Sequence, residues 1–329
     1  MSVILRKSTK KFFFISCILL SLLLFTGGCV FQSSSGNNST LQSSTQNSPI
    51  TASANTSKFV AISAGLFHSL ALKDNGTVVL WGEDSRTVRE IPKNLTDVVS
   101  IAAGNKFSLA LKRDGTVVFW GNPWNSHNVS ALTNISNVLA VSAGVGHGMV
   151  LRKDGTVVVK GGIQGGVLDI PSDLTNVTNI SAGYTHDLAL KNDGTVVAWG
   201  ANGNGQTNIP VNLTNVVAIA AGGWHSLALK DDGSVVAWGD NKKGQTNVPV
   251  NLTNVVAIAA GGVHSLALRS DGTVIAWGDN QLGQCNVPVH LRDVKAISAG
   301  QGFSLALKND GKIVCWGANY NSQCDVPDN

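Results

Sequence analysis

The sequence lacks the signatures by which many enzymes are recognised. It contains no GxSxG nucleophile turn, no HExxH zinc motif, no phosphate-binding loop and no pair of carboxylates set for acid–base chemistry. It also has no CxxC spacing and no cluster of histidines and cysteines that would hold zinc. These absences argue against an enzyme, and no cofactor and no metal ion are expected.

A basic excess is also missing from most of the chain. The first 29 residues carry four of the 24 basic residues and none of the 20 acidic ones, so the remainder holds 20 of each. Phosphate contacts need clustered Lys and Arg, and a neutral domain does not supply them. Nucleic acid is therefore not an expected partner.

The N-terminus has the order of an export signal. Four basic residues precede an apolar run from Phe12 to Phe25, which is too short to span a bilayer comfortably, and Thr26-Gly27-Gly28-Cys29 follows. Small residues directly before a cysteine resemble the lipobox of bacterial lipoproteins, although Thr26 stands where leucine is usual. We expect residues 1–29 to be a lipoprotein-type signal with lipid on Cys29; an ordinary signal peptide or an uncleaved anchor is the alternative.

Residues 30–57 are rich in Ser, Asn, Thr and Gln and have few large apolar side chains. Such a segment cannot bury enough surface to offset its ordering entropy, so a flexible tether is predicted. Lipid anchor, tether and globular domain follow one another in a consistent order. This order predicts a protein exported and lipid-anchored at the bacterial cell membrane or cell surface.

The rest of the chain, residues 58–329, repeats itself seven times. Three series of motifs keep the same register: Ala-Gly, Asp-Gly or Asn-Gly, and Trp-Gly, with Lys160 replacing tryptophan in the third copy. The glycines that close the Ala-Gly motif are spaced 39 or 40 residues apart, at Gly65, Gly104, Gly144, Gly183, Gly222, Gly261 and Gly300. A period near 40 is typical of propeller blades or helical pairs.

Local chemistry favours blades. In the fifth copy an apolar run begins at Val217, Ser226-Leu-Ala-Leu alternates, and Ser234-Val-Val-Ala-Trp is rich in β-branched residues. The Asp232-Gly233 pair between the last two segments indicates a tight hairpin. Each copy is therefore predicted to be an antiparallel sheet of about three strands.

Sheets that are apolar on both faces need cover on both sides, and stacking in a closed ring provides it. We predict an all-β fold, a seven-bladed β-propeller whose blades start near residues 58, 98, 138, 177, 216, 255 and 294. Small residues such as Ala220 and Ala221 mark the innermost strand. An open solenoid is the alternative, and it would leave two apolar faces exposed.

The pattern AxxAGxxHSLALKxDGxVVAWGxNxxGQ resembles the repeat of the regulator of chromosome condensation family. The 39-residue period, with xVP after the GQ, is more similar still to propeller-type β-lactamase inhibitors of soil bacteria. The resemblance covers about Lys58 to Pro327 and implies a seven-bladed propeller. It implies less about function, because one fold hosts unrelated activities.

Members of that family usually close the ring with a strand borrowed from the other terminus. Here the first copy begins with its first strand and the seventh ends with its third, so closure by side-chain packing alone is expected. Cys285 and Cys324 are equivalent in adjacent blades, and the Cα separation that a disulfide needs is met only near the axis. We expect buried or free thiols, with a Cys315–Cys324 bond that would pin the C-terminal tail as the open alternative.

The loops after the first and third strands fall on one face and vary where the rest repeats. Variable, partly aromatic side chains on a rigid ring are typical of a binding surface. The expected partner-binding residues are Leu66, Phe67, Asn105, Lys106, Trp124, Tyr184, Trp224, Val263, Asp240 and Asp279. In the resembling inhibitors, aromatic residues at such positions grip the partner, which Phe67 and Trp224 match in type and place.

The repeated histidines are assigned to the scaffold. His68, His147, His186, His225 and His264 share one position that Phe107 and Phe303 fill in the other two copies. A position that accepts phenylalanine twice does not require imidazole chemistry.

The sequence thus predicts a monomeric binding module whose partner is another protein, with a β-lactamase or cell-wall enzyme as the sharpest version. A glycan-binding or structural wall-associated propeller is the alternative, because aromatic side chains also stack on sugars. An enzyme built on the axial channel is the least favoured hypothesis.

Overall fold

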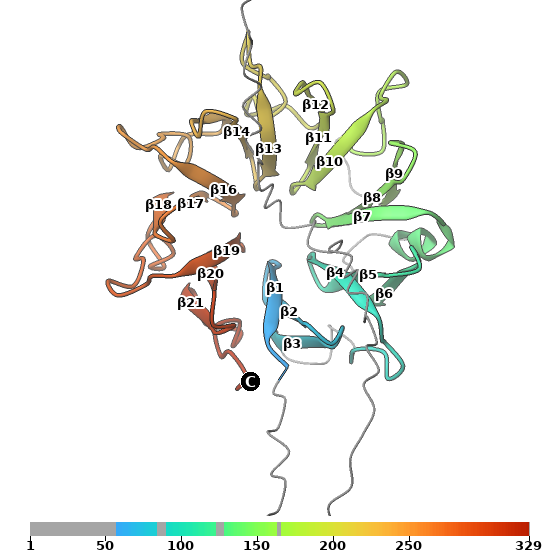
Figure 1. Ribbon diagram of the computed structural model, residues 1–329. Helices are drawn as coiled ribbons and strands as arrows, with labels where there is room; N and C mark the ends of the chain where they lie inside the picture. Colours follow the sequence, from blue (N-terminus) through green and yellow to red (C-terminus); the bar gives the residue numbers. More distant parts are fainter. Residues whose placement is uncertain (1–56, 84–89, 123–127, 163–165, 329) are drawn as a thin grey trace, which may run out of the picture.

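A computed structural model describes residues 57–83, 90–122, 128–162 and 166–328. Seven antiparallel sheets of three strands stand around a central axis (Figure 1), which confirms the seven-bladed propeller. Within each sheet the strands lie in sequence order. In the described ranges no helix is long and apolar enough to cross a bilayer.

The strands of a blade occupy three radial positions. The innermost strands are β1 (Phe59–Ala64), β4 (Val98–Ala103), β7 (Val138–Ala143), β10 (Val177–Ala182), β13 (Val216–Ala221), β16 (Val255–Ala260) and β19 (Val294–Ala299). The middle strands are β2 (His68–Lys73), β5 (Phe107–Lys112), β8 (His147–Arg152), β11 (His186–Lys191), β14 (His225–Lys230), β17 (His264–Arg269) and β20 (Phe303–Lys308). The outer strands are β3 (Val78–Gly82), β6 (Val117–Gly121), β9 (Val157–Gly161), β12 (Val196–Gly200), β15 (Val235–Gly239), β18 (Val274–Gly278) and β21 (Ile313–Gly317).

The hydrophobic core lies between blades. Leu188 and Leu190 of β11 pack with Ile219 of β13 and Trp238 of β15 in one buried cluster, and similar clusters fill the other interfaces. The alternating strands therefore bury both faces, and the tryptophans pack between blades. Because each core needs a neighbour, a blade is not an independent folding unit.

The third blade departs from the repeat. Lys160 replaces tryptophan, and Gly148 replaces the serine of most middle strands. A short 3-10 helix, η1 (Val129–Asn134), lies before this blade and buries Val129 and Leu132 in the core shared by the second and third blades. A Cβ on Gly148 would lie 2.7 Å from Leu132 Cδ1, so the helix uses space that a larger residue 148 would occupy. The sequence pattern does not predict this helix.

The glycine of each Ala-Gly motif sits where blades converge. A Cβ on Gly222 would lie 2.7 Å from the carbonyl oxygen of Gly261 in the next blade, and the ring of His225 lies against the same glycine. The same closeness recurs around the axis, for example from Gly183 to Gly222 at 2.6 Å. Any side chain there would clash, which explains why the motif ends in glycine in all seven copies.

A glutamine carbonyl links each late blade to the next. The main-chain oxygen of Gln245, which follows β15, accepts hydrogen bonds from Ser265 Oγ of β17 and Trp277 Nε1 of β18, both at 2.9 Å. Gln206 and Gln284 do the same for the blades that follow them. We call this arrangement the glutamine link. It satisfies a buried tryptophan N–H and a buried hydroxyl with one acceptor.

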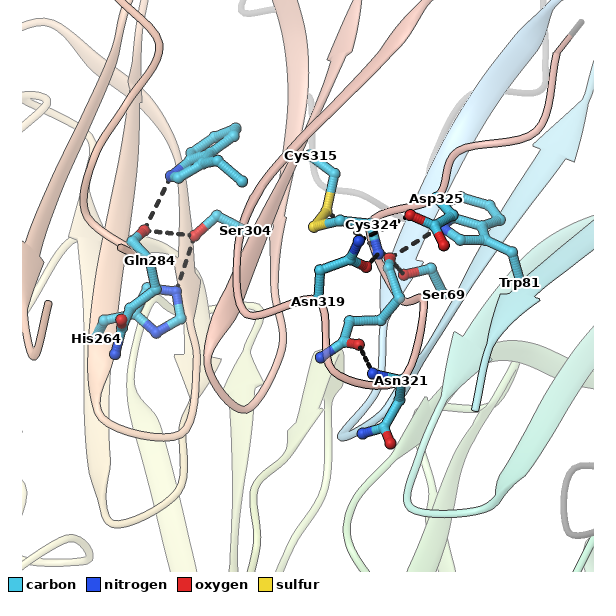
Figure 2. Close-up of a disulfide and its surroundings, with 12 residues drawn as sticks. Ser69, Trp81, His264, Gln284, Ser304, Cys315, Asn319, Asn321, Cys324 and Asp325 are labelled. Carbon is cyan, nitrogen blue, oxygen red and sulfur yellow. Dashed lines mark hydrogen bonds between the residues drawn. A yellow bond between two sulfur atoms is a disulfide. The ribbon is translucent and has the colours of Figure 1, made fainter. Parts of the chain in front are cut away.

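The seam between the seventh and first blades carries the same link. The carbonyl oxygen of Gln323 accepts from Ser69 Oγ at 3.0 Å and from Trp81 Nε1 at 2.9 Å (Figure 2). Ala64 N donates to Ser298 Oγ at 2.9 Å, and the two blades share a buried cluster that includes Phe59. The expectation of closure by side-chain packing alone is therefore wrong: hydrogen bonds donated by the first blade to the C-terminal tail also close the ring.

A disulfide holds that tail in place. Cys315 on β21 is bonded to Cys324, the residue directly after Gln323, with their Cα atoms 5.2 Å apart (Figure 2). The expectation of free thiols is thus wrong for this pair, and the alternative pairing is the one observed. Cys285, the equivalent of Cys324 in the sixth blade, is a free thiol. Its blade has Ala276 where the seventh has Cys315, so no partner is at hand.

We predict that the double substitution Cys315→Ser, Cys324→Ser lowers the free energy of unfolding by about 2–3 kcal/mol, because it frees a short loop of the unfolded chain and unpins Gln323. Chemical denaturation measures the loss. Hydrogen exchange should accelerate first at the Trp81 indole and along β1.

The matched control is Cys285→Ser, which keeps a donor toward the carbonyl oxygen of Asp279. It should change the free energy of unfolding by less than about 0.5 kcal/mol. Equal losses in the two variants, or a double variant as stable as the parent protein, would contradict a pinning role for the disulfide.

Candidate functional site

The loops that follow strands one and three lie on one face, as the strand directions predict. Asp240 N, directly after β15, donates to the carbonyl oxygen of Trp224 in the first loop of the same blade at 2.8 Å. We call the surface formed by these loops the loop face. The opposite ends of the blades carry the Asp-Gly hairpins, where Gly233 has a φ of 79°.

The loops after the outer strands are fixed by their own side chains. Asn241 Oδ1 accepts from Thr246 N at 3.1 Å, and Asn241 Nδ2 donates to Asn247 Oδ1 at 2.8 Å. Gln245 Oε1 accepts from Lys243 N at 2.9 Å. Equivalent bonds order the loops of the fourth, sixth and seventh blades. This part of the loop face is therefore preorganised for binding.

Asp240 and Asp279, expected to contact a partner, also make hydrogen bonds that hold the loops. Asp240 Oδ2 accepts from Gln245 Nε2 at 2.8 Å, and Asp279 Oδ2 accepts from Gln284 Nε2 at 2.7 Å. Lys243 Nζ also lies 3.3 Å from Asp279 Oδ1. Both carboxylates are largely buried, so they hold the glutamine loops and offer little area to a partner.

Two other residues expected to bind a partner are buried or form an ion pair within the protein. Asn105 is buried, with 5% of its surface exposed, and does not present its side chain to solvent. Lys106 Nζ lies 3.3 Å from Glu83 Oε1, an ion pair between the second and first blades. Lys106 adopts a φ of 59°, so its backbone belongs to a tight turn.

The aromatic residues of the loop face come together. The rings of Tyr184 and Trp224, from the fourth and fifth blades, meet edge to face with centroids 5.3 Å apart. Trp224 keeps 38% of its surface exposed. Leu66, Phe67 and Val263 are half-buried in the equivalent loops of their blades. An exposed tryptophan braced by a second ring supplies contact area at low entropic cost.

Tyr184 also reaches the mouth of the axial channel. It lines a cavity of about 70 Å³ together with Leu66, Gln301 and the seven Ala-Gly pairs. Its hydroxyl lies against Gly262 of the sixth blade, where a Cβ would come within 2.8 Å of the oxygen. Burial raises the pKa of the Tyr184 hydroxyl above its ordinary value. Sequence reasoning places Tyr184 on this face but gives no sign of its reach across two blades.

The remaining expected positions, Trp124 and Cys29, lie outside the described residues. Sequence reasoning gave Leu282 no role, although it is exposed in the second loop of the sixth blade beside Gly302. In the described part of the chain no group of three or more His, Cys, Asp or Glu side chains is placed to hold a metal ion.

The repeated histidines belong to the frame. His225 is fully buried, and its Nε2 lies 3.0 Å from Ser265 Oγ of the next blade. Because Ser265 Oγ itself donates to the carbonyl of Gln245, it accepts from the imidazole, which fixes the neutral form with hydrogen on Nε2. His264 and Ser304 repeat this arrangement (Figure 2).

One pair differs in chemistry. His147 Nε2 lies 2.7 Å from Asp187 Oδ1, where the other copies have serine or glycine, and both side chains are fully buried. Burial raises the pKa of Asp187, and the nearby His147 opposes that shift. Sequence reasoning missed this pair, although its signal is visible in the change from HSLAL to HDLAL at residue 187.

Burial lowers the pKa of the framework histidines, to about 4 for His68 and His264 and to about 3 for His186 and His225. The unfolded chain protonates them near the ordinary value of about 6.5. Between these values the unfolded state binds more protons, so the free energy of unfolding falls as the pH is lowered from 6.5 toward 4. Each histidine contributes up to about 1.4 kcal/mol per pH unit.

We predict that His264→Phe reduces this acid sensitivity by about one histidine's contribution. Phe303 already fills the equivalent position of the seventh blade, where it is fully buried, and Ser304 keeps its bond to Gln284, so the fold should tolerate the change. Denaturation curves from pH 7 to 4 measure the slope. The control His290→Gln, at an exposed connector position, should leave it unaltered; an unchanged slope in His264→Phe would contradict the assignment.

Comparison with known proteins agrees with this architecture. The family model described as "Regulator of chromosome condensation (RCC1) repeat" matches residues 59–86, 98–128, 177–206, 216–245, 255–284 and 294–323. The third copy, with Lys160 and Gly148, falls outside the matched ranges. A search of curated protein sequences finds no match.

Several solved structures share the fold. The ectodomain of the receptor kinase CR4 from Physcomitrella patens is 20% identical, with 79% of this chain and 74% of that chain covered and a TM-score of 0.64. The CRINKLY WD40 ectodomain of the Arabidopsis thaliana receptor kinase ACR4 is 21% identical, with 81% and 98% covered and a TM-score of 0.62. Prp20p from Saccharomyces cerevisiae, described with its binding to Gsp1p and histones, is 22% identical, with 81% and 82% covered and a TM-score of 0.60.

Proposed function

The chain belongs to the regulator of chromosome condensation repeat family, and from that premise we propose that it is a protein-binding module that uses its loop face. The exposed Trp224, braced by Tyr184 on preorganised loops, is the observation that carries the proposal. Tryptophan and tyrosine dominate the energetically important positions of protein interfaces. Prp20p, a propeller of this type, is itself described as binding other proteins, Gsp1p and histones.

The proposed partner is a β-lactamase or a related cell-wall enzyme. Two aromatic positions support it, Phe67 and Trp224, which resemble in place and type the residues that grip the partner in propeller-type inhibitors. Phe67 and Trp224 come from the first and fifth blades, so a partner that touches both spans the channel mouth. Asp240 and Asp279 hold the loops of this surface, and Asn105 is buried beneath it.

The proposed location follows from the N-terminal sequence. Basic residues, an apolar run from Phe12 to Phe25 and the small residues before Cys29 support export and lipid attachment. A tether over residues 30–57 would give the propeller freedom to meet wall-associated enzymes at the cell surface. Blades that stack on one another in a closed ring leave the loop face available for recognition.

We predict that Phe67→Ala, Trp224→Ala weakens binding to the partner enzyme at least 30-fold, because truncation of a central aromatic anchor costs about 2 kcal/mol or more. Surface plasmon resonance of the purified protein against a panel of serine β-lactamases and cell-wall transpeptidases measures the dissociation constants. Arg113→Ala, Lys153→Ala on the hairpin ends is the control and should change them less than about 2-fold.

An unchanged dissociation constant in the aromatic double variant, for an enzyme that the parent protein binds, would overturn the assignment of the loop face. Binding to peptidoglycan fragments without binding to any enzyme of the panel would favour the glycan-binding alternative. Turnover of a substrate by the purified protein would contradict a purely binding role.

The anchoring proposal has its own test. We predict that Cys29→Ser moves the protein from the membrane fraction to the soluble fraction and abolishes incorporation of labelled fatty acid in a bacterial host. Cys17→Ser, within the apolar run, is the control and should retain both properties. Membrane association and labelling that persist in Cys29→Ser would exclude lipidation at that residue.

A further inference from the structure

The mouth of the axial channel on the loop face is a small cavity with an unusual chemical lining. Its volume is about 70 Å³, enough for the tip of one side chain. Seven alanines and seven glycines form most of its wall, so most of its polar atoms are main-chain N–H and C=O groups. Tyr184 and Gln301 add the polar side chains of the rim.

Most main-chain donors around this mouth are already occupied. Each of the seven glycine N–H groups donates at 2.9 Å to the carbonyl of the first residue of the middle strand in its own blade, as Gly65 does to His68. Four of the seven alanine N–H groups donate to a serine hydroxyl of the preceding blade. The N–H groups of these seven pairs therefore leave little main-chain donor capacity for an anion.

The acceptors are arranged differently. Each carbonyl from Gly104 to Gly300 is directed at the preceding blade, so that oxygens follow one another around the axis. The carbonyls of Gly104, Gly222, Gly261 and Gly300 accept one N–H each from a neighbouring loop, and a carbonyl oxygen has a second lone pair. Several main-chain oxygens that retain an unused lone pair therefore belong to residues that line the mouth.

Tyr184 adds an unsatisfied group at the same place. Its hydroxyl oxygen is buried, has no hydrogen-bond partner in the described structure and lies at the cavity beside Gly262. Buried hydroxyls are normally bonded, so a lone hydroxyl at a cavity indicates a missing ligand atom. Trp224 packs against the ring of Tyr184 and helps hold the hydroxyl in position.

We propose that the channel mouth binds a primary ammonium group, supplied by a lysine side chain of the protein partner. An ammonium is a compact cation with three donors, which matches a ring of carbonyl acceptors and the lone pairs of the Tyr184 oxygen. A guanidinium is planar and spreads its charge and donors over a wide fork, so it does not present a compact group of three donors to these acceptors. Carbonyl oxygens replace the water that the ammonium loses on entry.

This proposal rests on the proposed role of the loop face in protein binding and adds the chemistry of the group inserted at its centre. A lysine at the channel mouth and aromatic contacts at Trp224 belong to one footprint, because Tyr184 touches both. The ammonium site can nevertheless be tested without the partner, so the two proposals can fail separately.

The test titrates the purified protein with methylammonium chloride while glycine-labelled amide resonances are recorded by NMR. Saturable shifts at Gly183, Gly222 and Gly261 are expected with a millimolar dissociation constant, which is the limit for so small a ligand. Methanol, formate and tetramethylammonium are the matched neutral, anionic and bulky probes. Comparable shifts with formate or methanol, or no saturable shift with methylammonium, would overturn the proposal.

Tyr184→Phe tests the hydroxyl. It should weaken methylammonium binding at least 5-fold and leave thermal stability unchanged or raised, because the lost oxygen has no partner in the free protein. Tyr320→Phe, at an exposed residue of the seventh blade, should leave the methylammonium affinity unchanged. Equal methylammonium affinity in Tyr184→Phe and the parent protein would contradict the role of Tyr184. Loss of enzyme binding in Phe67→Ala, Trp224→Ala concerns the face as a whole and does not bear on this titration.

Discussion

The interaction on which the late part of the ring depends is a bond to a main-chain oxygen. In the glutamine link, one carbonyl accepts from the tryptophan and the serine of the next blade. The glutamine side chain makes its hydrogen bonds within its own loop and so holds the main-chain carbonyl in place. The link therefore requires that a loop of one blade be correctly folded before the next blade is satisfied. The carbonyl of Gln323 accepts from Ser69 and Trp81 in the same way. The ring is therefore closed by the same hydrogen bonds that join the other late blades.

Convergence at the axis imposes the second constraint. The glycines that meet there have no room for a Cβ, and the aromatic ring of the middle strand packs against each of them. Both His and Phe rings fit this geometry, which explains why Phe107 and Phe303 occupy the histidine position without disturbing their blades. The imidazole adds a bond to the next blade at the cost of a buried titratable group. The histidine therefore adds a contact between blades but lowers the stability of the fold at acid pH.

The blades could be predicted from sequence because their signals are local. A fixed period, Asp-Gly hairpins and alternating strands each depend on neighbouring residues, and all appear where they were expected. The glutamine link could not be predicted, because every residue carries a main-chain carbonyl. Only the fold determines which carbonyl lies within hydrogen-bond distance of a tryptophan N–H. Asp240 and Asp279 show the same limit on the loop face. Variability marked them as contacts, but a varying polar residue serves equally well to hold a loop, and sequence does not separate the two uses.

The loop face is asymmetric for a reason that begins in the scaffold. The fifth and sixth blades have a second glycine after the first, Gly223 and Gly262, where other blades have larger residues. Those glycines leave a recess, and Tyr184 extends into it from the fourth blade until its hydroxyl meets Gly262. Trp224 then rests on Tyr184 and remains exposed. The exposed Trp224 ring and the buried, unpartnered Tyr184 hydroxyl thus both follow from the two additional glycines. The feature that distinguishes this face is therefore a departure from sevenfold repetition.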